Sequence, residues 1–130
     1  MTGIEPQLWT GRAAAAVRFY ERGFGAIVLH QVGAGDDIVA QLTVGDARFW
    51  VSAADPGRGR LDPPAAGGTT GRTLLLADDP AALQARAVAA GATETSPVQP
   101  EHGWLLGRIV DPFGHEWELG RPLRQWPPAS

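Results

Sequence analysis

One order of secondary-structure signals, a strand, a helix and three further strands, occurs twice in this chain of 130 residues. In residues 11–26, apolar side chains recur at helical spacing on one face, with glycines near both ends to open and close a helix. In residues 78–92, Asp79 suits the N-cap, Pro80 the first helical position and Gly91 the stop. The predicted buried faces consist of Ala13, Ala16, Val17, Tyr20 and Phe24 in the first helix and Leu83, Ala87 and Ala90 in the second.

Each predicted helix follows one β-type segment and precedes three more. The predicted strands lie at 4–10, 26–32, 36–44 and 47–53 in the first half and at 72–78, 93–99, 103–110 and 115–120 in the second. The intervening segment is rich in proline and glycine, so we expect a long connecting loop there. The sequence therefore predicts one domain, residues 1–130. It comprises module one at about 4–54, a linking loop at about 55–70 and module two at about 71–123.

The composition restricts the classes of function. Hydrophobic residues make up 44% and charged residues 19%, which is typical of a soluble globular chain, and the net charge of -3 argues against a nucleic-acid partner. The absence of cysteine excludes disulfides, thiolate metal ligands and a cysteine nucleophile. No apolar run approaches the roughly 20 residues of a membrane span, and the first residues do not resemble a signal peptide. We therefore expect a cytoplasmic protein with no membrane partner.

Two motifs, "AVRFYERGFGA" after the first predicted strand and "DPFGHEWEL" in the second half, carry a family resemblance. Over about residues 4–123 the chain resembles the vicinal oxygen chelate superfamily. That group includes glyoxalase I, extradiol dioxygenases, fosfomycin-modifying enzymes and bleomycin-resistance proteins. The resemblance implies an α+β fold of paired βαβββ modules whose curled mixed sheets form a cup. It also implies a homodimer with the cups near the subunit interface.

Enzymes of this superfamily place up to four metal ligands on the inner faces of the cup strands. Carried over by the resemblance, these positions are Glu5, Gln41, Arg72 and Glu118. An arginine stays protonated and offers only donors, so Arg72 cannot bind a cation. The remaining three positions contain no imidazole, which zinc, nickel and non-haem iron sites usually require. We therefore expect no metal and no cofactor.

Alternation along the predicted strands indicates which side chains share the cup with these four. Trp9 and Trp50 are expected to line the cavity and Trp117 to belong to the core. Spacing does not place Trp104 or Trp126, and the position of Trp104 near the loop end of its strand leaves a place at the rim of the cavity open. The predicted ligand-binding residues are Glu5, Gln7, Trp9, Val39, Gln41, Thr43, Arg48, Trp50, Arg72, Trp104 and Glu118. No residue is predicted to be catalytic. The sequence leaves open whether Arg72 pairs with Glu118 or contacts a ligand.

Three functions remain open at this point. The first is non-enzymatic binding and sequestration of a bulky, partly aromatic natural product, such as a bleomycin-like or enediyne antibiotic, as in resistance proteins of the bleomycin type. The second is a lyase, isomerase or dioxygenase that uses Glu118 with or without a divalent metal. The third is an assembly domain whose cup is filled by its own side chains. Two indole walls with few polar groups favour the first.

Overall fold

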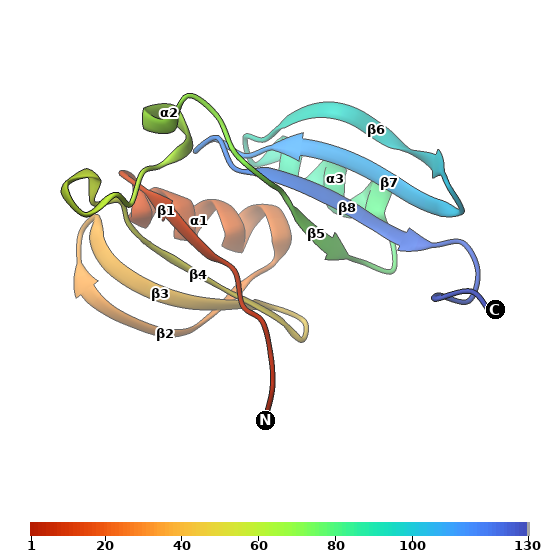
Figure 1. Ribbon diagram of the computed structural model, residues 1–130, viewed down its shortest axis with the longest axis horizontal. Helices are drawn as coiled ribbons and strands as arrows, with labels where there is room; N and C mark the ends of the chain where they lie inside the picture. Colours follow the sequence, from red (N-terminus) through yellow and green to blue (C-terminus); the bar gives the residue numbers. More distant parts are fainter. Residues whose placement is uncertain (130) are drawn as a thin grey trace.

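In a computed structural model that describes residues 1–129, the chain forms two βαβββ modules side by side (Figure 1). Module one contains β1 (Gln7–Thr10), α1 (Ala13–Phe24), β2 (Ile27–Ala34), β3 (Asp37–Val44) and β4 (Ala47–Ala53). Module two contains β5 (Thr73–Leu76), α3 (Pro80–Ala89), β6 (Thr93–Glu101), β7 (Trp104–Val110) and β8 (Glu116–Pro122). The predicted α+β fold of paired modules is confirmed. None of the helices in the described part of the chain has the length and hydropathy needed to cross a bilayer.

The two sheets have the same topology. Sheet one has the strand order β1-β4-β3-β2 and sheet two the order β5-β8-β7-β6. In each, the first strand pairs in parallel with the fourth, and the remaining pairs are antiparallel. The sheets are curved and do not close on each other (Figure 1).

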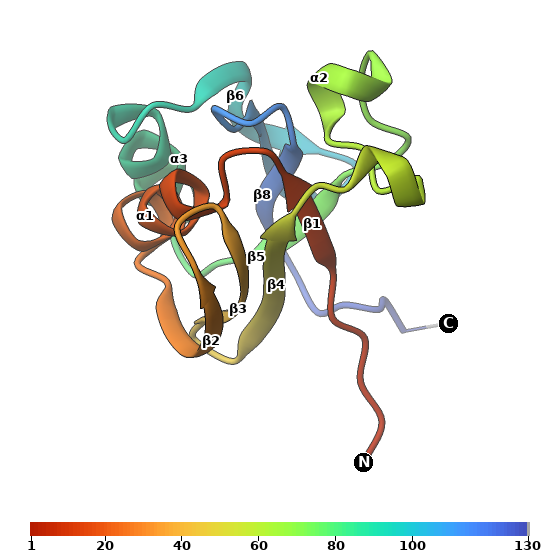
Figure 2. The same cartoon turned by 90° about the vertical axis from the view of Figure 1, so that its left-hand side faces the viewer.

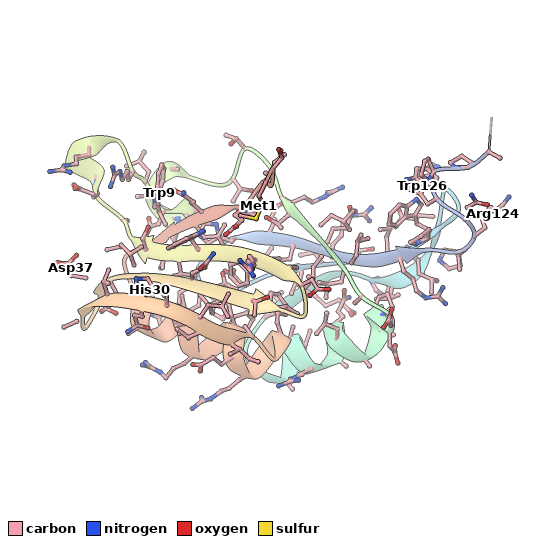
Figure 3. The ribbon with its side chains drawn as sticks, turned by 90° about the horizontal axis from the view of Figure 1, so that it is seen from below. Met1, Trp9, His30, Asp37, Arg124 and Trp126 are labelled. Atoms are coloured by element: carbon pink, nitrogen blue, oxygen red, sulfur yellow. The ribbon has the colours of Figure 1, made fainter. Side chains whose placement is uncertain are left out.

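Both long helices lie on the same side of the two sheets and pack against each other (Figure 2). The buried cluster between helices and sheets includes Tyr20 and Phe24 of α1, Phe49 of β4 and Trp117 of β8, whose rings contact one another. The opposite side of both sheets carries neither long helix, and Trp9 and Trp126 project from it at opposite ends (Figure 3). We call this side the open face.

Local signals explain the ends of the helices. The Asp79 side chain accepts a hydrogen bond from the Ala82 amide at 3.1 Å, which caps α3 as predicted, and Pro80 occupies its first turn. α1 ends where Gly25 adopts a left-handed conformation with φ of 69°. A side chain there would be strained, so glycine at this position stops the helix.

The structure corrects two details. The segment expected to be a loop contains two short helices, η1 (Pro56–Arg58) and α2 (Pro63–Ala66). α2 forms because Asp62 accepts from the Ala65 amide at 3.1 Å and Pro63 presets the first helical residue. Asp62 also accepts from the Gly11 amide at 3.3 Å, which ties the linker to the start of module one.

The second correction concerns the inner face of α3. Ala87 is buried as predicted, whereas Leu83 and Ala90 are only half-buried and Gln84 takes the central position. The Gln84 amide donates to the Glu94 carboxylate and to the Ser96 carbonyl, both at 2.8 Å. These two bonds satisfy the amide donors of Gln84, whereas its Oε1 is buried without a hydrogen-bond partner among the described residues.

A buried carboxylate joins the two modules. Asp111 follows β7 and accepts from the Tyr20 hydroxyl of module one, from the Trp117 indole at 2.9 Å and from the amides of Phe113 and His115. Because Asp111 is 3% exposed, these donors replace the water that a carboxylate requires. His115 adds a second link, since its Nε2 lies 2.9 Å from the Trp9 carbonyl oxygen.

Ionisation of Tyr20 makes the free energy of unfolding depend on pH in the alkaline range. Burial, reinforced by the neighbouring Asp111 carboxylate, raises the pKa of the Tyr20 phenol well above its ordinary value of about 10. The stabilisation is therefore complete below pH ~10 and is lost as the pH rises through the folded-state pKa. The chain has one tyrosine, no cysteine and no lysine, so no other side chain ionises in this range except arginine. We expect the free energy of unfolding to fall by up to about 1.4 kcal/mol per pH unit above pH ~10.

Urea unfolding at a series of alkaline pH values measures this dependence. The Tyr20→Phe variant should be less stable at neutral pH, because Asp111 loses a donor, but its stability should vary little with alkaline pH. An equally steep loss in Tyr20→Phe would show that another group is responsible.

Candidate functional site

The open face of sheet one carries the predicted wall residues of module one. Along β3 and β4, side chains that alternate with buried Ala40, Leu42 and Phe49 point away from the helices. The open-face residues of this sheet include Gln7, Trp9, Val39, Gln41, Thr43, Arg48 and Trp50, and also His30, which pairs with Gln41 in the register.

Glu5 lies at the centre of a small polar cluster on this sheet. Its Oε1 accepts from Gln41 Nε2 at 2.8 Å and from the Trp50 indole Nε1 at 2.9 Å. Gln41 and Trp50 are neighbours in the β3–β4 register, and the segment before β1 brings Glu5 over them. Three side chains that are far apart in the sequence therefore form one site, which we call the Glu5 cluster.

Sheet two carries a chain of alternating charges that runs from β6 across β7 and β8 to the residue before β5. Arg108 of β7 binds both oxygens of Glu101 on β6 at 3.0 Å and donates from Nε to Glu118 of β8 at 3.0 Å. Arg72, immediately before β5, lies 3.1 Å from the same Glu118 oxygen. Hydrogen bonds from Arg108 hold the pKa of Glu101 below its ordinary value, and the same contacts raise the pKa of Arg108. We call this set the polar chain.

The structure thus forms the Arg72–Glu118 pair that the sequence left open, and adds Arg108, which the sequence reasoning missed. A signal for Arg108 existed. Residues 111–115 form the turn of the β7–β8 hairpin, and counting outward from it pairs Arg108 with Glu118. The contact with Glu101 had no comparable signal, because the β6–β7 pairing contains two register shifts.

The Glu5 cluster and the polar chain occupy equivalent positions in the two modules. In sheet one Gln7 pairs with Trp50, and in sheet two Leu74 pairs with Glu118. Glu5 lies two residues before Gln7, and Arg72 lies two residues before Leu74. In the same way, Gln41 opposite Trp50 corresponds to Arg108 opposite Glu118. The carboxylate belongs to the segment just before the first strand in module one and to the fourth strand in module two.

These positions do not fit a divalent metal ion. Arg72 and Arg108 offer only donors, and the module-one equivalent of Glu118 is the indole of Trp50. Within residues 1–129, no three His, Cys, Asp or Glu side chains are grouped so that they could hold a metal. No metal chemistry can therefore be assigned to this site.

Trp104 lies at the outer end of β7, with its side chain on the same strand face as Arg108. Trp126 packs against it edge to face, with ring centroids 5.2 Å apart. The segment that carries Trp126 is held by a 2.9 Å hydrogen bond from the Leu123 amide to the Gly103 carbonyl. The two indoles form an end wall on the open face, far from Trp9 (Figure 3).

Two hollows adjoin the Glu5 cluster. One, of about 420 Å³, lies between β4 and β5 and is lined by residues of both modules. The other, of about 530 Å³, lies over sheet one beside Thr43 and Arg48. Glu5 lines both. No hydrogen bond or ion pair joins the Glu5 cluster to the polar chain within the described residues, so the predicted wall residues form two groups, not one.

The fold and the site define a protein of paired βαβββ modules with tryptophans and ordered polar groups on an open face. The chain belongs to the Glyoxalase/Bleomycin resistance protein/Dioxygenase superfamily, whose sequence profile matches residues 4–119. An uncharacterized protein of Mycobacterium bovis is 32% identical over 128 residues, which cover 94% of this chain and 84% of the relative.

Solved structures agree with this assignment. A protein of Arabidopsis thaliana superimposes with a TM-score of 0.71 at 25% identity, covering 93% of this chain and 99% of that one. A bleomycin-binding protein in complex with bleomycin superimposes with a TM-score of 0.65 at 27% identity, covering 93% of this chain and 98% of that one.

We expect the purified protein to hold no stoichiometric transition metal, because two arginines occupy the site that a cation would need. Elemental analysis of protein purified without added metal, and again after dialysis against zinc, nickel or manganese, measures this. The double variant Arg72→His, Arg108→Gln removes both arginines and should bind more metal than the unaltered chain. Tight metal binding by the unaltered chain would contradict the expectation.

Proposed function

We propose that this protein binds and sequesters a bulky, partly aromatic natural product without transforming it. The observation that supports this most directly is that Glu118 is held in place by its neighbours. Its Oε2 is bound by two guanidinium groups and its side chain is only 12% exposed, so it is a fixed polar wall residue. Trp9 and Trp50 supply flat apolar surfaces on the same open face, where an aromatic ligand can stack.

The relatives support the same function. The bleomycin-binding protein, which was solved with its ligand, shares the fold and 27% of aligned residues with this chain. The superfamily name also includes enzymes, glyoxalases and dioxygenases. The polar chain offers neither a free base nor a metal site, because Glu118 is held by two guanidinium groups. The hollows of about 420 and 530 Å³ are large enough for drug-sized groups, which argues against a face filled by its own side chains.

The proposal includes a homodimer in which a second copy covers the open face. Six large apolar side chains project from it without cover: Ile27, Leu29, Val32, Val39, Leu74 and Leu76, each between 41% and 64% exposed. An apolar surface of this kind typically marks an interface. A second copy fits best because a single chain supplies only one side of the cup that its superfamily membership implies.

A thermal-shift screen against natural-product antibiotics identifies the ligand. A compound at about 100 times its Kd should raise the free energy of unfolding by about 2.7 kcal/mol. Calorimetry and tryptophan quenching with that compound then test the site. We expect Glu118→Gln to weaken binding about tenfold, because the charge-assisted bonds that hold Arg72 and Arg108 in position on the open face are weakened. Trp50→Ala and Trp9→Ala should weaken it at least as much, because each removes an apolar wall.

Glu21→Gln is the matched control, since Glu21 is exposed on α1, away from the open face, and carries the same charge change. It should bind as tightly as the unaltered chain. If Glu118→Gln abolishes a measurable turnover while ligand affinity survives, the protein is an enzyme and the sequestration proposal fails.

Light scattering at micromolar concentration tests the dimer. We expect a dimer for the unaltered chain and a monomer for the Val39→Glu, Leu74→Glu variant, because two charges would be buried at the interface. Val39 and Leu74 are 41% and 43% exposed, and Val88 on α3 is 40% exposed, so Val88→Glu is a control of equal exposure outside the open face. A monomeric unaltered chain, or equal dissociation by Val88→Glu, would contradict the proposal.

A further inference from the structure

The carboxylate of Glu5 is oriented but its charge is not neutralised. Both hydrogen bonds that it accepts, from Gln41 and from Trp50, end on Oε1. Among the described residues, Oε2 has no hydrogen-bond partner and no cationic group lies within 4 Å of the carboxylate. One oxygen thus fixes the position of the side chain while the other remains available.

The equivalent site in module two shows the contrast. Glu118 is bound by two guanidinium groups, Arg72 and Arg108, whereas the donors to Glu5 are a neutral amide and a neutral indole. Neutral donors hold a carboxylate in place but leave its full negative charge to attract another group. The two modules therefore present one compensated and one uncompensated carboxylate on the same open face.

Glu5, whose side chain is exposed, lines an apolar hollow. The cavity of about 420 Å³ is also lined by apolar residues of both modules, among them Ile4, Phe49, Leu74 and Trp117. Its charged lining residues are Glu5, Asp46 and Arg48, which together carry one net negative charge. A ligand that complements this hollow has an apolar body and a positive charge.

We infer that the hollow between β4 and β5 binds an amphipathic organic cation whose ammonium or amidinium group contacts Glu5 Oε2. Such a group donates a charge-assisted hydrogen bond to the free oxygen, about twice as strong as one between neutral groups. The apolar body would occupy the space between the modules. The inference rests on the proposed binding function and names the chemical class of the ligand, or of the part of it that enters this hollow.

Other classes of ligand fit less well. An anion would meet the Glu5 and Asp46 carboxylates with only Arg48 to attract it. A neutral polar ligand could donate to Oε2 but would leave the carboxylate's charge uncompensated as the hollow lost its water. A bare metal ion lacks further ligands, since no three metal-binding side chains are grouped in residues 1–129.

Two small probes of nearly equal shape separate charge from apolar burial. One is 1-naphthylmethylamine, which is an ammonium ion at neutral pH, and the other is 1-naphthylmethanol, which is neutral. Calorimetry should show that the unaltered chain binds the ammonium probe about tenfold more tightly than the alcohol. Glu5→Gln keeps an acceptor for Gln41 and Trp50 and removes the charge, so it should abolish this preference while binding the alcohol unchanged.

Glu21→Gln again serves as the control for net charge and should retain the full preference. Equal affinity of both probes for the unaltered chain, a preference that survives in Glu5→Gln, or no binding of either probe would overturn the inference. The proposed function fails on separate evidence, namely when no natural product raises the stability of the protein although the ammonium probe binds.

Discussion

The hydrogen bonds of one buried carboxylate hold the two modules in a fixed relation. Asp111 accepts from α1 through Tyr20 and from β8 through Trp117, while two amides of the intervening turn complete its shell. Trp117 precedes Glu118, so the bond that fixes the indole toward the helices also turns the next side chain onto the open face. The arrangement of the polar chain therefore depends on a core interaction on the other side of the sheet.

The two modules share a geometry and differ in their electrostatics. The same three positions hold Glu5, Gln41 and Trp50 in one sheet and Arg72, Arg108 and Glu118 in the other. In both, one carboxylate accepts from two neighbouring side chains. The donors are neutral in module one and cationic in module two, so the charge of Glu118 is compensated by its neighbours and that of Glu5 is not.

Much of this could be predicted from the sequence, and the failures share a cause. The strand and helix order, the Asp79 cap and the inward and outward faces of β3 follow from local spacing, which the sequence displays directly. The burial of Gln84 does not, because it depends on partners in β6 that come into place only on folding. Nor does the side-by-side placement of two half-cups on an open face, which depends on how α1 packs against α3.

Glycine at position 107 illustrates the same limit. It lies opposite Gln84, and a Cβ there would come within 2.2 Å of the Gln84 side-chain oxygen and 2.5 Å of Val98. In the sequence, Gly107 is merely an interruption of an apolar strand. Only the tertiary structure shows that its missing side chain makes room for a polar residue from the helix.

The polar chain also has a mechanical consequence. Its four side chains, from β6, β7, β8 and the residue before β5, run across sheet two in the direction of the backbone hydrogen bonds, so they act as a second set of cross-links on the open face. Satisfied charged networks resist deformation, because any change in sheet curvature must stretch several ion pairs at once. At the equivalent positions of sheet one, the side-chain contacts among the described residues are the two hydrogen bonds that Glu5 accepts. Sheet two should therefore be the stiffer of the two sheets, and sheet one the sheet whose curvature changes more readily.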